Sequence, residues 1–231
     1  MTKLPEKTAS PALNSRQIKD LLYEQVARIG KATSSPKRLE LLELLCQGEK
    51  NVEQLAGQAQ ISIKLTSAHL SVLKTASLVI SRREGKNIYY SLAASDVARF
   101  WVNMRSLAEE RLLDLQAALD NLVSGSGSLA KLDRAELLRE AESGDVVVID
   151  VRPEAEYLAG HLPFARSIPV AELKKRIAEI PPNKTVVAYC RGPFCLYAGE
   201  AVGILQAAGH HAVRLADGVA EWQAQGLAIE R

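Results

Sequence analysis

The sequence predicts two domains of different class: a mainly α-helical domain with one β-hairpin, then an α/β domain with a parallel sheet. The run SGSGS at 124–128 has the composition of a flexible linker. Before it, apolar residues recur with a helical period. After it, helical segments alternate with short apolar runs such as DVVVIDV and TVVAYC, the pattern of strands joined by helices. We therefore expect one domain at 16–123 and a second at 129–231.

The composition limits the class of protein. Residues 1–15 lack the apolar core of a signal peptide, and we expect a disordered tail there. No apolar run approaches the roughly 18 residues of a transmembrane helix, so we expect a cytoplasmic protein without a membrane partner. The net charge is +2, with the basic excess in the first domain, which permits an anionic partner. Three cysteines in such a chain are more often reactive or buried thiols than structural disulfides.

Five helical segments and a hairpin are expected before the linker. Arg16–Ile29 has an apolar face, and SSPKRLELLELLCQ has Ser35 as N-cap before Pro36. The short helix NVEQLAGQAQ precedes a second one that Ser62 opens. The segment SLVISRREGKNIYYSL predicts a hairpin with the turn EGKN, and Ser95–Val123 predicts one long amphipathic helix.

Two short helices followed by a basic hairpin form the layout of a winged helix-turn-helix. Its second helix can enter the major groove of DNA while the hairpin touches the backbone. The expected donors on that helix are Lys64, Thr66, Ser67 and His69, and the expected charges on the hairpin are Arg82, Arg83 and Lys86. A solvated helix and hairpin without a ligand are the alternative, which the ordered set of elements disfavours.

The PKRLELLELL helix, the S-x-x-x-x-S-x-H-L helix and the RREGKNIYY hairpin resemble an ArsR-type (ArsR/SmtB) repressor. The resemblance implies a homodimer formed through Arg16–Ile29 and Ser95–Val123, which binds an inverted repeat in double-stranded operator DNA and releases it when an inducer binds. It also implies contacts to bases or phosphates from Ser62, Lys64, Ser67 and His69, and salt-dependent contacts to phosphates from Arg82, Arg83 and Lys86.

One departure from that family concerns metals. Many metal-sensing members carry Cys-x-Cys where this chain reads NVEQL, and the helix at 95–123 has no His or Cys. We therefore expect no metal site. Cys46 lies on an apolar helix and is expected to be an inert buried thiol, with a sensing thiol paired across the dimer as the alternative.

In the second domain, a helix is expected at 129–143, and the strand DVVVIDVR carries Asp150 and Arg152 at its carboxyl end. After the turns of PEAEYLAGHLPFARSIP come the helix AELKKRIAEI, the strand TVVAYC, which ends on Cys190, and the helix LYAGEAVGILQAAG. Backbone N–H groups of the loop after Cys190 and the next helix N-terminus are expected to lower the pKa of this thiol. A thiolate there can accept a sulfur atom.

Three motifs resemble a single rhodanese domain: D-V-R-P-x-x-E-Y-x-x-G-H-L-P-x-A-x-x-I-P, a strand ending in Tyr189-Cys190, and L-x-D-G-x-x-E-W. The resemblance implies a transient persulfide on Cys190, received from a sulfur donor, and no other cofactor. It implies that Asp150 and Arg152 support the site and that residues 191–195, beginning with Arg191, form a cup around the sulfur.

The cup departs from that family at two positions. Pro193 has no N–H to donate, and Cys195 stands where a Thr, Ser or Arg often contacts the substrate, which disfavours efficient turnover of thiosulfate. Cys195 could instead attack a persulfide on Cys190 to give a disulfide or a sulfur-bridged link. The alternative is a small residue that only packs at the start of a helix.

Other cysteine sites fit less well. A phosphatase would need an Arg at Leu196, and a thioredoxin-like pair would need C-x-x-C. A zinc site would need two further ligands, for which His210 and His211 are the nearby candidates. The sequence therefore predicts a transcriptional regulator, a repressor, that senses reactive sulfur through Cys190 and Cys195. A sulfurtransferase with an attached DNA-binding domain is the alternative, and a metal- or arsenic-responsive repressor lacks ligands.

Overall fold

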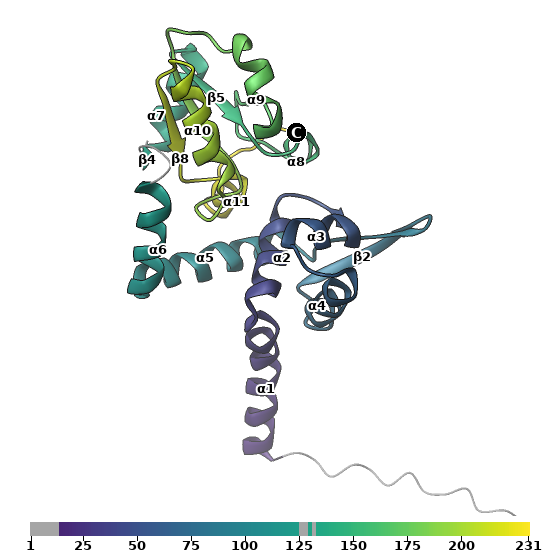
Figure 1. Cartoon of the computed structure of the whole chain (residues 1–231). Coiled ribbons are helices and arrows are strands. Elements are labelled where there is room, and N and C mark those ends of the chain that lie inside the picture. Colours follow the sequence, from purple (N-terminus) through teal and green to yellow (C-terminus); the bar gives the residue numbers. More distant parts are fainter. Residues whose placement is uncertain (1–13, 125–128, 131–132) are drawn as a thin grey trace, which may run out of the picture.

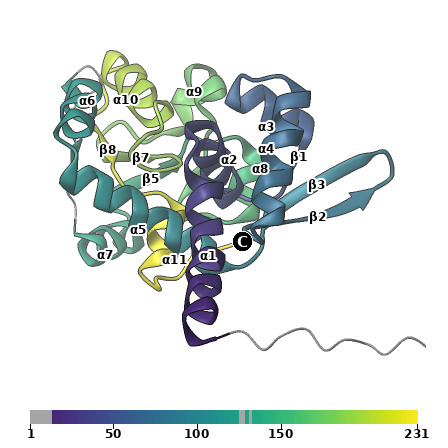
Figure 2. The same ribbon diagram turned by 90° about the horizontal axis from the view of Figure 1, so that it is seen from below.

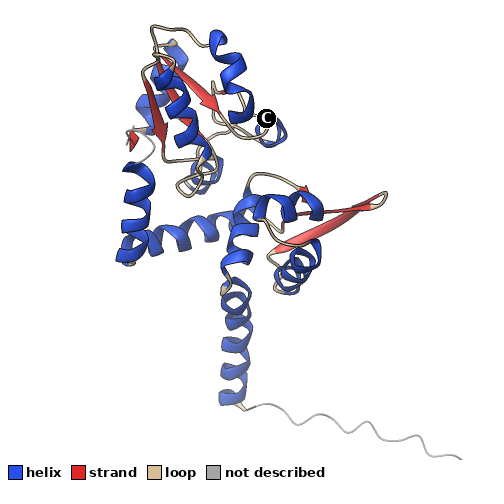
Figure 3. Ribbon diagram, in the orientation of Figure 1, coloured by secondary structure: helices blue, strands red, loops and turns tan. Residues whose placement is uncertain are grey.

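The computed structural model describes residues 14–124, 129–130 and 133–231, and it contains a mainly helical N-terminal domain and an α/β C-terminal domain (Figures 1 and 3). The expected tail at 1–15 and linker at 124–128 lie outside the described residues, apart from residues 14, 15 and 124.

The helices of the N-terminal domain begin where capping residues predict. They are α1 (Ser15–Thr33), α2 (Pro36–Cys46), α3 (Val52–Ala59) and α4 (Ile63–Thr75). Ser35 is the N-cap of α2, although its side chain makes no capping hydrogen bond. The Ser62 hydroxyl accepts the N–H of Leu65 and caps α4. Asn51 and Gln54 form a capping box at α3 that the sequence analysis did not single out.

The hairpin forms with the expected turn. Strands β2 (Val79–Glu84) and β3 (Asn87–Leu92) pair antiparallel up to Glu84 and Asn87, and Gly85 supplies the left-handed conformation of the turn, with φ +59°. The short strand β1 (Lys50–Asn51) pairs with the other edge of β3. Figure 2 shows the hairpin projecting away from the C-terminal domain.

Apolar side chains of α2, α3, α4 and β2 form the core of the N-terminal domain, with Leu41, Leu55 and Leu70 fully buried. Helix α1 extends away from this core (Figure 1). Its apolar face remains exposed in the single chain, with Leu22 61% and Val26 70% accessible. Such a face on a surface helix needs a partner to bury it.

The expected single helix at Ser95–Val123 is two helices, α5 (Ser95–Arg111) and α6 (Leu113–Ser124). Leu112 between them is extended, with φ −105° and ψ 104°, and α6 turns away from the axis of α5 (Figure 1). The Gln116 side chain donates to the Glu109 carbonyl at 2.8 Å and holds the corner. The corner contains neither Gly nor Pro, and the helical pattern of apolar residues continues across it, so the sequence predicted a single helix.

The C-terminal domain has a five-stranded parallel sheet in the order β4-β8-β7-β5-β6. The strands are β4 (Leu129–Ala130), β5 (Val146–Asp150), β6 (Arg166–Ser167), β7 (Thr185–Tyr189) and β8 (Ala212–Leu215). The helix expected at 129–143 starts later, at α7 (Arg134–Ser143), where Asp133 caps it. Residues 129–130 pair with β8 instead.

Helices cover both faces of this sheet. One core packs under α9 (Val170–Arg176) and α10 (Tyr197–Ala207), and it contains Cys190. The other packs under α7 and α11 (Val219–Ala224), around Trp222. The remaining elements are α8 (Glu154–Ala159), in a segment expected to consist of turns, and the 3-10 turn η1 (Ile177–Glu179).

The C-terminal domain rests on α2 and α5, with α11 beside α5 (Figures 1 and 2). Trp101 and Val102 of α5 are buried in one cluster with Ala220 of α11. The chain after α2 also passes close to α8: a Cβ atom added at Gly48, which has φ +122°, would lie 2.8 Å from the Cβ of Ala159. The two domains thus share a packed boundary.

Candidate functional site

The two neighbouring cysteines lie at the carboxyl end of the parallel sheet. Cys190 follows β7 directly and is 1% exposed, whereas Cys195 at the start of α10 is half-buried. Between them the loop doubles back: Gly192 has φ +120°, and its carbonyl accepts the N–H of Cys195 at 3.2 Å. The Cys190 Sγ lies 3.6 Å from the Cys195 carbonyl oxygen, so the loop brings both thiols together.

The protonation of this pair differs from the expectation that Cys190 is the activated thiolate. Burial, together with hydrogen bonding to Cys195, raises the pKa of Cys190 well above its usual range. The pKa of Cys195 falls to about 6, because the Cys190 thiol donates to it and the N–H groups of Arg191 and Tyr197 do the same. The N–H groups of the loop therefore stabilise a thiolate on Cys195.

Arg191 is close to the pair but already has a partner. Its guanidinium binds Glu156 through Nε at 2.9 Å and Nη2 at 2.7 Å. Glu156 also pairs with Lys50 of the N-terminal domain at 3.1 Å, and both are buried. Burial tends to raise the pKa of Glu156, but Arg191 and Lys50 lower it on balance. Arg191 thus belongs to an ion network across the domain boundary.

Asp150 and Arg152 lie behind the loop. Both are fully buried, and Arg152 Nε donates to Asp150 at 2.9 Å. Tyr189, the residue before Cys190, donates its hydroxyl proton to Asp150 at 2.6 Å. Arg152 also donates to Gln47 of the N-terminal domain at 2.9 Å. Asp150 and Arg152 thus stabilise the carboxyl end of β7 and do not contact the thiols directly.

A buried arginine that the sequence analysis did not single out lies against the same loop. Arg214 of β8 is 2% exposed, and its Nη2 donates to the Pro193 carbonyl at 2.6 Å. Its Nε and Nη1 have no hydrogen-bond partner among the described residues. Its charge acts to lower the pKa of Cys190, against the larger opposing effects.

The loop is covered by the N-terminal domain. The ring of Phe194 packs edge-on against Trp101 of α5, with centroids 6.5 Å apart. The Arg105 guanidinium lies 5.5 Å from the centre of the Phe194 ring and pairs with Glu221 of α11 at 2.9 Å. Arg105 and Glu221 are both buried, so this contact joins α5 to the segment that supports the loop.

Glu221 and Glu43 complete this boundary. Glu221 accepts the N–H of Gly218 at 2.6 Å, and a Cβ at Gly218 would meet the Cys190 carbonyl at 2.5 Å. Gly218 must therefore be glycine for the loop to approach.

Burial raises the pKa of Glu43 of α2 to about 7, with a further contribution from the negative charge of Cys195. One carboxyl of α2 thus responds to the charge on a cysteine in the other domain.

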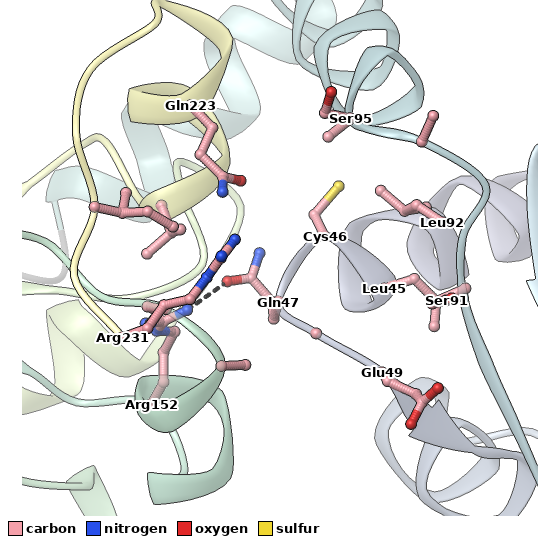
Figure 4. A pocket seen from close by; sticks show the side chains of 17 residues that line it. Leu45, Cys46, Gln47, Glu49, Ser91, Leu92, Ser95, Arg152, Gln223 and Arg231 are labelled. Atoms are coloured by element: carbon pink, nitrogen blue, oxygen red, sulfur yellow. Dashed lines mark hydrogen bonds between the residues drawn. The ribbon is translucent and has the colours of Figure 1, made fainter.

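Cys46 also lies at the boundary, in the cluster formed by Trp101 and Phe194. Burial raises its pKa, which fits an unreactive thiol. It lines a pocket of about 290 Å³ between the domains, together with Gln47, Arg152 and Arg231 (Figure 4). The residues that line this pocket do not include Cys190 or Cys195.

The residues expected to contact DNA lie on α4 and the hairpin. Lys64 and Ser67 are exposed on α4 and His69 is half-buried, with its pKa lowered by burial and by Arg38. The expectation that Thr66 is exposed was wrong, because its side chain is buried and its hydroxyl donates to the Ser62 carbonyl at 3.0 Å.

On the hairpin, the side chains of Arg82, Arg83 and Lys86 are exposed. Arg82 is held by the carboxylates of Glu49 and Glu84. It would have to exchange those partners to reach a phosphate, whereas the one hydrogen bond that Arg83 donates among the described residues goes to the Gly85 carbonyl at 3.1 Å. The two sets of candidate residues thus occupy separate domains.

The described residues form neither a metal cluster nor a membrane-spanning helix. Within residues 14–124, 129–130 and 133–231, no three His, Cys, Asp or Glu side chains are grouped to hold a metal ion. In the same ranges, no helix is long and apolar enough to cross a membrane.

The functional residues that sequence reasoning missed are Glu43, Arg105 and Arg214, and it assigned no role to Glu221 of the L-x-D-G-x-x-E-W motif. Arg105 and Glu221 are 116 positions apart, and Arg214 looked like one charge in an otherwise apolar strand. A charge within a predicted buried strand was a usable signal, since charged residues are rarely buried without a partner. Nothing local distinguished Glu43 or Arg105.

Comparisons with known proteins agree with this division of the chain. A family model described as "Bacterial regulatory protein, arsR family" matches residues 35–81, and a "Rhodanese-like domain" model matches residues 133–225. The chain is 45% identical over 213 residues to the HTH-type transcriptional regulator Rv0324 of Mycobacterium tuberculosis, covering 92% of this chain and 93% of that protein.

Two partial matches cover one domain each. A sulfurtransferase of Allochromatium vinosum is 35% identical over 92 residues, which is 39% of this chain and 84% of that protein. A solution structure of a homodimeric winged helix-turn-helix DNA-binding domain from Mycobacterium bovis is 41% identical. It covers 45% of this chain and 94% of that one, with a TM-score of 0.40.

Proposed function

Because the chain belongs to the ArsR-type helix-turn-helix transcriptional regulators that carry a rhodanese-like domain, we propose that it senses persulfides or polysulfides through Cys190 and Cys195. One observation carries the proposal: the loop that holds both thiols packs directly on α5 of the DNA-binding domain through Phe194 and Trp101. A chemical change in the loop therefore acts on the DNA-binding domain without an intermediate partner.

The protonation of the pair sets the order of reaction. Cys195, as the thiolate, attacks a sulfane sulfur of the polysulfide, and the rest of the polysulfide leaves as an anion. Cys190 then attacks the Cys195 sulfur and displaces the added sulfur as hydrosulfide, which gives a disulfide. Where Cys195 carries two or more added sulfur atoms, Cys190 attacks the first of them and displaces the rest as an anion, which gives a sulfur-bridged link. Two thiols lose two electrons, which reduce sulfane sulfur, so no further oxidant is needed. A persulfide first formed on Cys190, as the rhodanese resemblance implies, is the alternative order.

The consequence for the domain boundary is electrostatic. Bridging removes the negative charge of Cys195, and the pKa of Glu43 then falls, because that charge is one of the influences that raise it. Glu43 of α2 then loses its proton more readily, within the electrostatic influence of Arg105 and Glu221. Since α2 and α5 carry the contacts between the domains, the boundary repacks when the cysteines react.

The DNA-binding half of the proposal places α4 in the major groove of an inverted repeat. Lys64 and Ser67 are exposed there for contacts to bases or phosphates, with Ser62 and His69 beside them. Arg82, Arg83 and Lys86 of the hairpin would contact phosphates. The exposed apolar face of α1 supports a homodimer, as does the exposure of Leu107, Leu112 and Leu113 near the corner of α5 and α6.

A DNA-binding titration tests the proposal. A duplex selected from a random library by the reduced protein is titrated with the full chain before and after treatment with inorganic polysulfide. We expect at least a tenfold loss of affinity, equivalent to about 1.4 kcal/mol. Mass spectrometry of the treated protein should show a link between Cys190 and Cys195.

Matched variants complete the test. Cys190→Ser and Cys195→Ser should stay on DNA after treatment, whereas Cys46→Ser should respond like the wild type. Equal release of the wild type and Cys190→Ser would contradict the proposal. Sulfur found on the Cys190 peptide of Cys195→Ser, with wild-type release, would support the alternative order.

A sulfurtransferase is the second candidate, favoured by the match to the Allochromatium vinosum protein. The cover formed by the N-terminal domain and the missing N–H of Pro193 weigh against fast turnover. Steady-state thiosulfate:cyanide kinetics separate the two: rapid turnover without any change in DNA affinity would favour the enzyme.

A further inference from the structure

Arg214 is an unusual buried cation. It is 2% exposed, and it makes one hydrogen bond, to the Pro193 carbonyl, among the described residues. Its Nε and Nη1 have no partner there. A guanidinium removed from water normally has a carboxylate or several acceptors, since an uncompensated buried charge is strongly destabilising.

The other guanidinium groups around the thiol pair are already neutralised. Arg191 binds Glu156, Arg105 binds Glu221, and Arg152 binds Asp150, each at 2.9 Å or less. Arg214 forms no such ion pair with a carboxylate in the described ranges. It is therefore the cation near the loop whose charge remains available to an anion.

The sheet directs Arg214 toward Cys190. Side chains of a strand alternate between its faces, and Ala212 of β8 belongs to the core that contains Cys190, whereas Val213 and Leu215 belong to the other. Arg214 thus lies on the face of Cys190. Its hydrogen bond to Pro193 places the guanidinium against the loop that joins the two thiols.

We infer that Arg214 is the counter-ion of an anionic sulfur at Cys190, formed once Cys195 carries added sulfur and its negative charge lies on the outer sulfur atom. The inference rests on the proposed function and adds a positioning residue to it. While Cys195 is a thiolate, burial and then the hydrogen bond and the charge of Cys195 raise the pKa of Cys190 and keep it protonated. When Cys195 has reacted with a polysulfide, its negative charge moves from the Cys195 sulfur to the outer sulfur atom and the repulsion at Cys190 weakens, so the proton of Cys190 leaves to solvent while Arg214 stabilises the new thiolate. The pair then closes only after Cys195 is loaded.

Alkylation in a Cys46→Ser/Cys195→Ser background tests Arg214 on Cys190 alone. The rate at which iodoacetamide alkylates Cys190 in the full chain is measured as a function of pH. The parent, which keeps Arg214, is compared with Arg214→Lys, Arg214→Gln and Arg214→Met. We expect Gln and Met to slow alkylation at neutral pH about tenfold and to move the midpoint of the pH profile upward. The Lys variant keeps the charge, so its alkylation rate should stay near that of the parent. The Gln variant keeps a hydrogen-bond donor for the Pro193 carbonyl but lacks the charge.

Two outcomes would overturn the inference. If the Gln and Met variants are alkylated as fast as the parent across the pH range, Arg214 does not act on Cys190. If the Lys variant loses as much alkylation rate as the Met variant, Arg214 only positions the loop and its charge does not act on Cys190. Neither result depends on DNA or polysulfide, so both are distinct from failure of the proposed function, in which the wild type would remain on DNA after polysulfide treatment.

Discussion

Arg105 of α5 and Glu221 of α11 form a buried ion pair across the domain boundary, with Nη2 and Oε1 2.9 Å apart. Arg105 also lies over the ring of Phe194, the residue that precedes Cys195. The same side chain therefore contacts the cysteine loop and belongs to the helix that continues toward the corner at Leu112. This pair connects the chemistry of the loop to the DNA-binding domain.

Replacing Arg105 by Met should lower the free energy of unfolding by about 3–5 kcal/mol, because Glu221 would be left as a buried charge without a partner. Urea unfolding followed by circular dichroism measures the loss. Arg99→Met, an exposed change on the same helix, should have little effect. The double variant Arg105→Met/Glu221→Gln should recover part of the stability. Equal stability of the Arg105 and Arg99 variants would show that the boundary does not form in solution.

Cys195 should react with iodoacetamide with a midpoint near pH 6, whereas Cys190 should react slowly at neutral pH. Cys190→Ala removes the thiol that donates to Cys195, so the pKa of Cys195 should rise and its alkylation at pH 7 should slow about tenfold. Peptide mapping by mass spectrometry assigns each rate. Cys46→Ala serves as the control and should leave both rates unchanged, and a faster Cys190 would reverse the assignment of the thiolate.

Glu43 should make the protein less stable as pH rises. Its folded pKa of about 7 lies above the value of 4.5 for a free glutamate, so the folded state holds more protons between those values. The stabilisation is complete below pH 4.5 and is lost as pH approaches 7. Thermal melting of Glu43→Gln should show a gain over wild type at pH 8 that shrinks toward pH 5.

Lys64, Arg83 and Lys86 should each contribute to the salt dependence of DNA binding. Loss of one phosphate contact reduces the slope of log affinity against log salt concentration by about 1. Fluorescence anisotropy at several salt concentrations measures this slope for each Ala variant. Lys175→Ala, an exposed change on α9, should leave the slope unchanged. An unchanged slope in all three variants would place the DNA elsewhere.

Leu22→Glu and Val26→Glu should convert the dimer to a monomer, because each introduces a charge into the apolar face of α1. Analytical ultracentrifugation gives the mass in solution. Ala27→Glu, on the opposite face of the same helix, should remain dimeric. A dimer in all three variants would exclude α1 from the interface.

Elements with local signals were predictable from the sequence. Caps at Ser35 and Ser62 located α2 and α4, the turn EGKN located the hairpin, and apolar runs located β5 and β7. The corner at Leu112 was not predictable, because no Gly or Pro marks it and the helical pattern of apolar residues continues across it. Residues 129–130 likewise become a strand only because β8 offers a free edge.

The site divides in the same way. The position of Cys190 after a buried strand could be inferred from local pattern, and so could its closeness to Cys195. Which thiol carries the charge could not, since that depends on the directions of the N–H groups of Arg191 and Tyr197. Ion pairs such as Lys50 with Glu156 join residues of different domains and leave no local signal.

Gly48 offers a way to open the boundary mechanically. The domains approach there with room for a hydrogen atom only, since a methyl group would collide with Ala159. The Gly48→Ala substitution would separate the domains at α8 by steric repulsion and leave every cysteine unchanged. Comparing that chain with the polysulfide-treated protein would separate the mechanical contribution to DNA release from the chemical one.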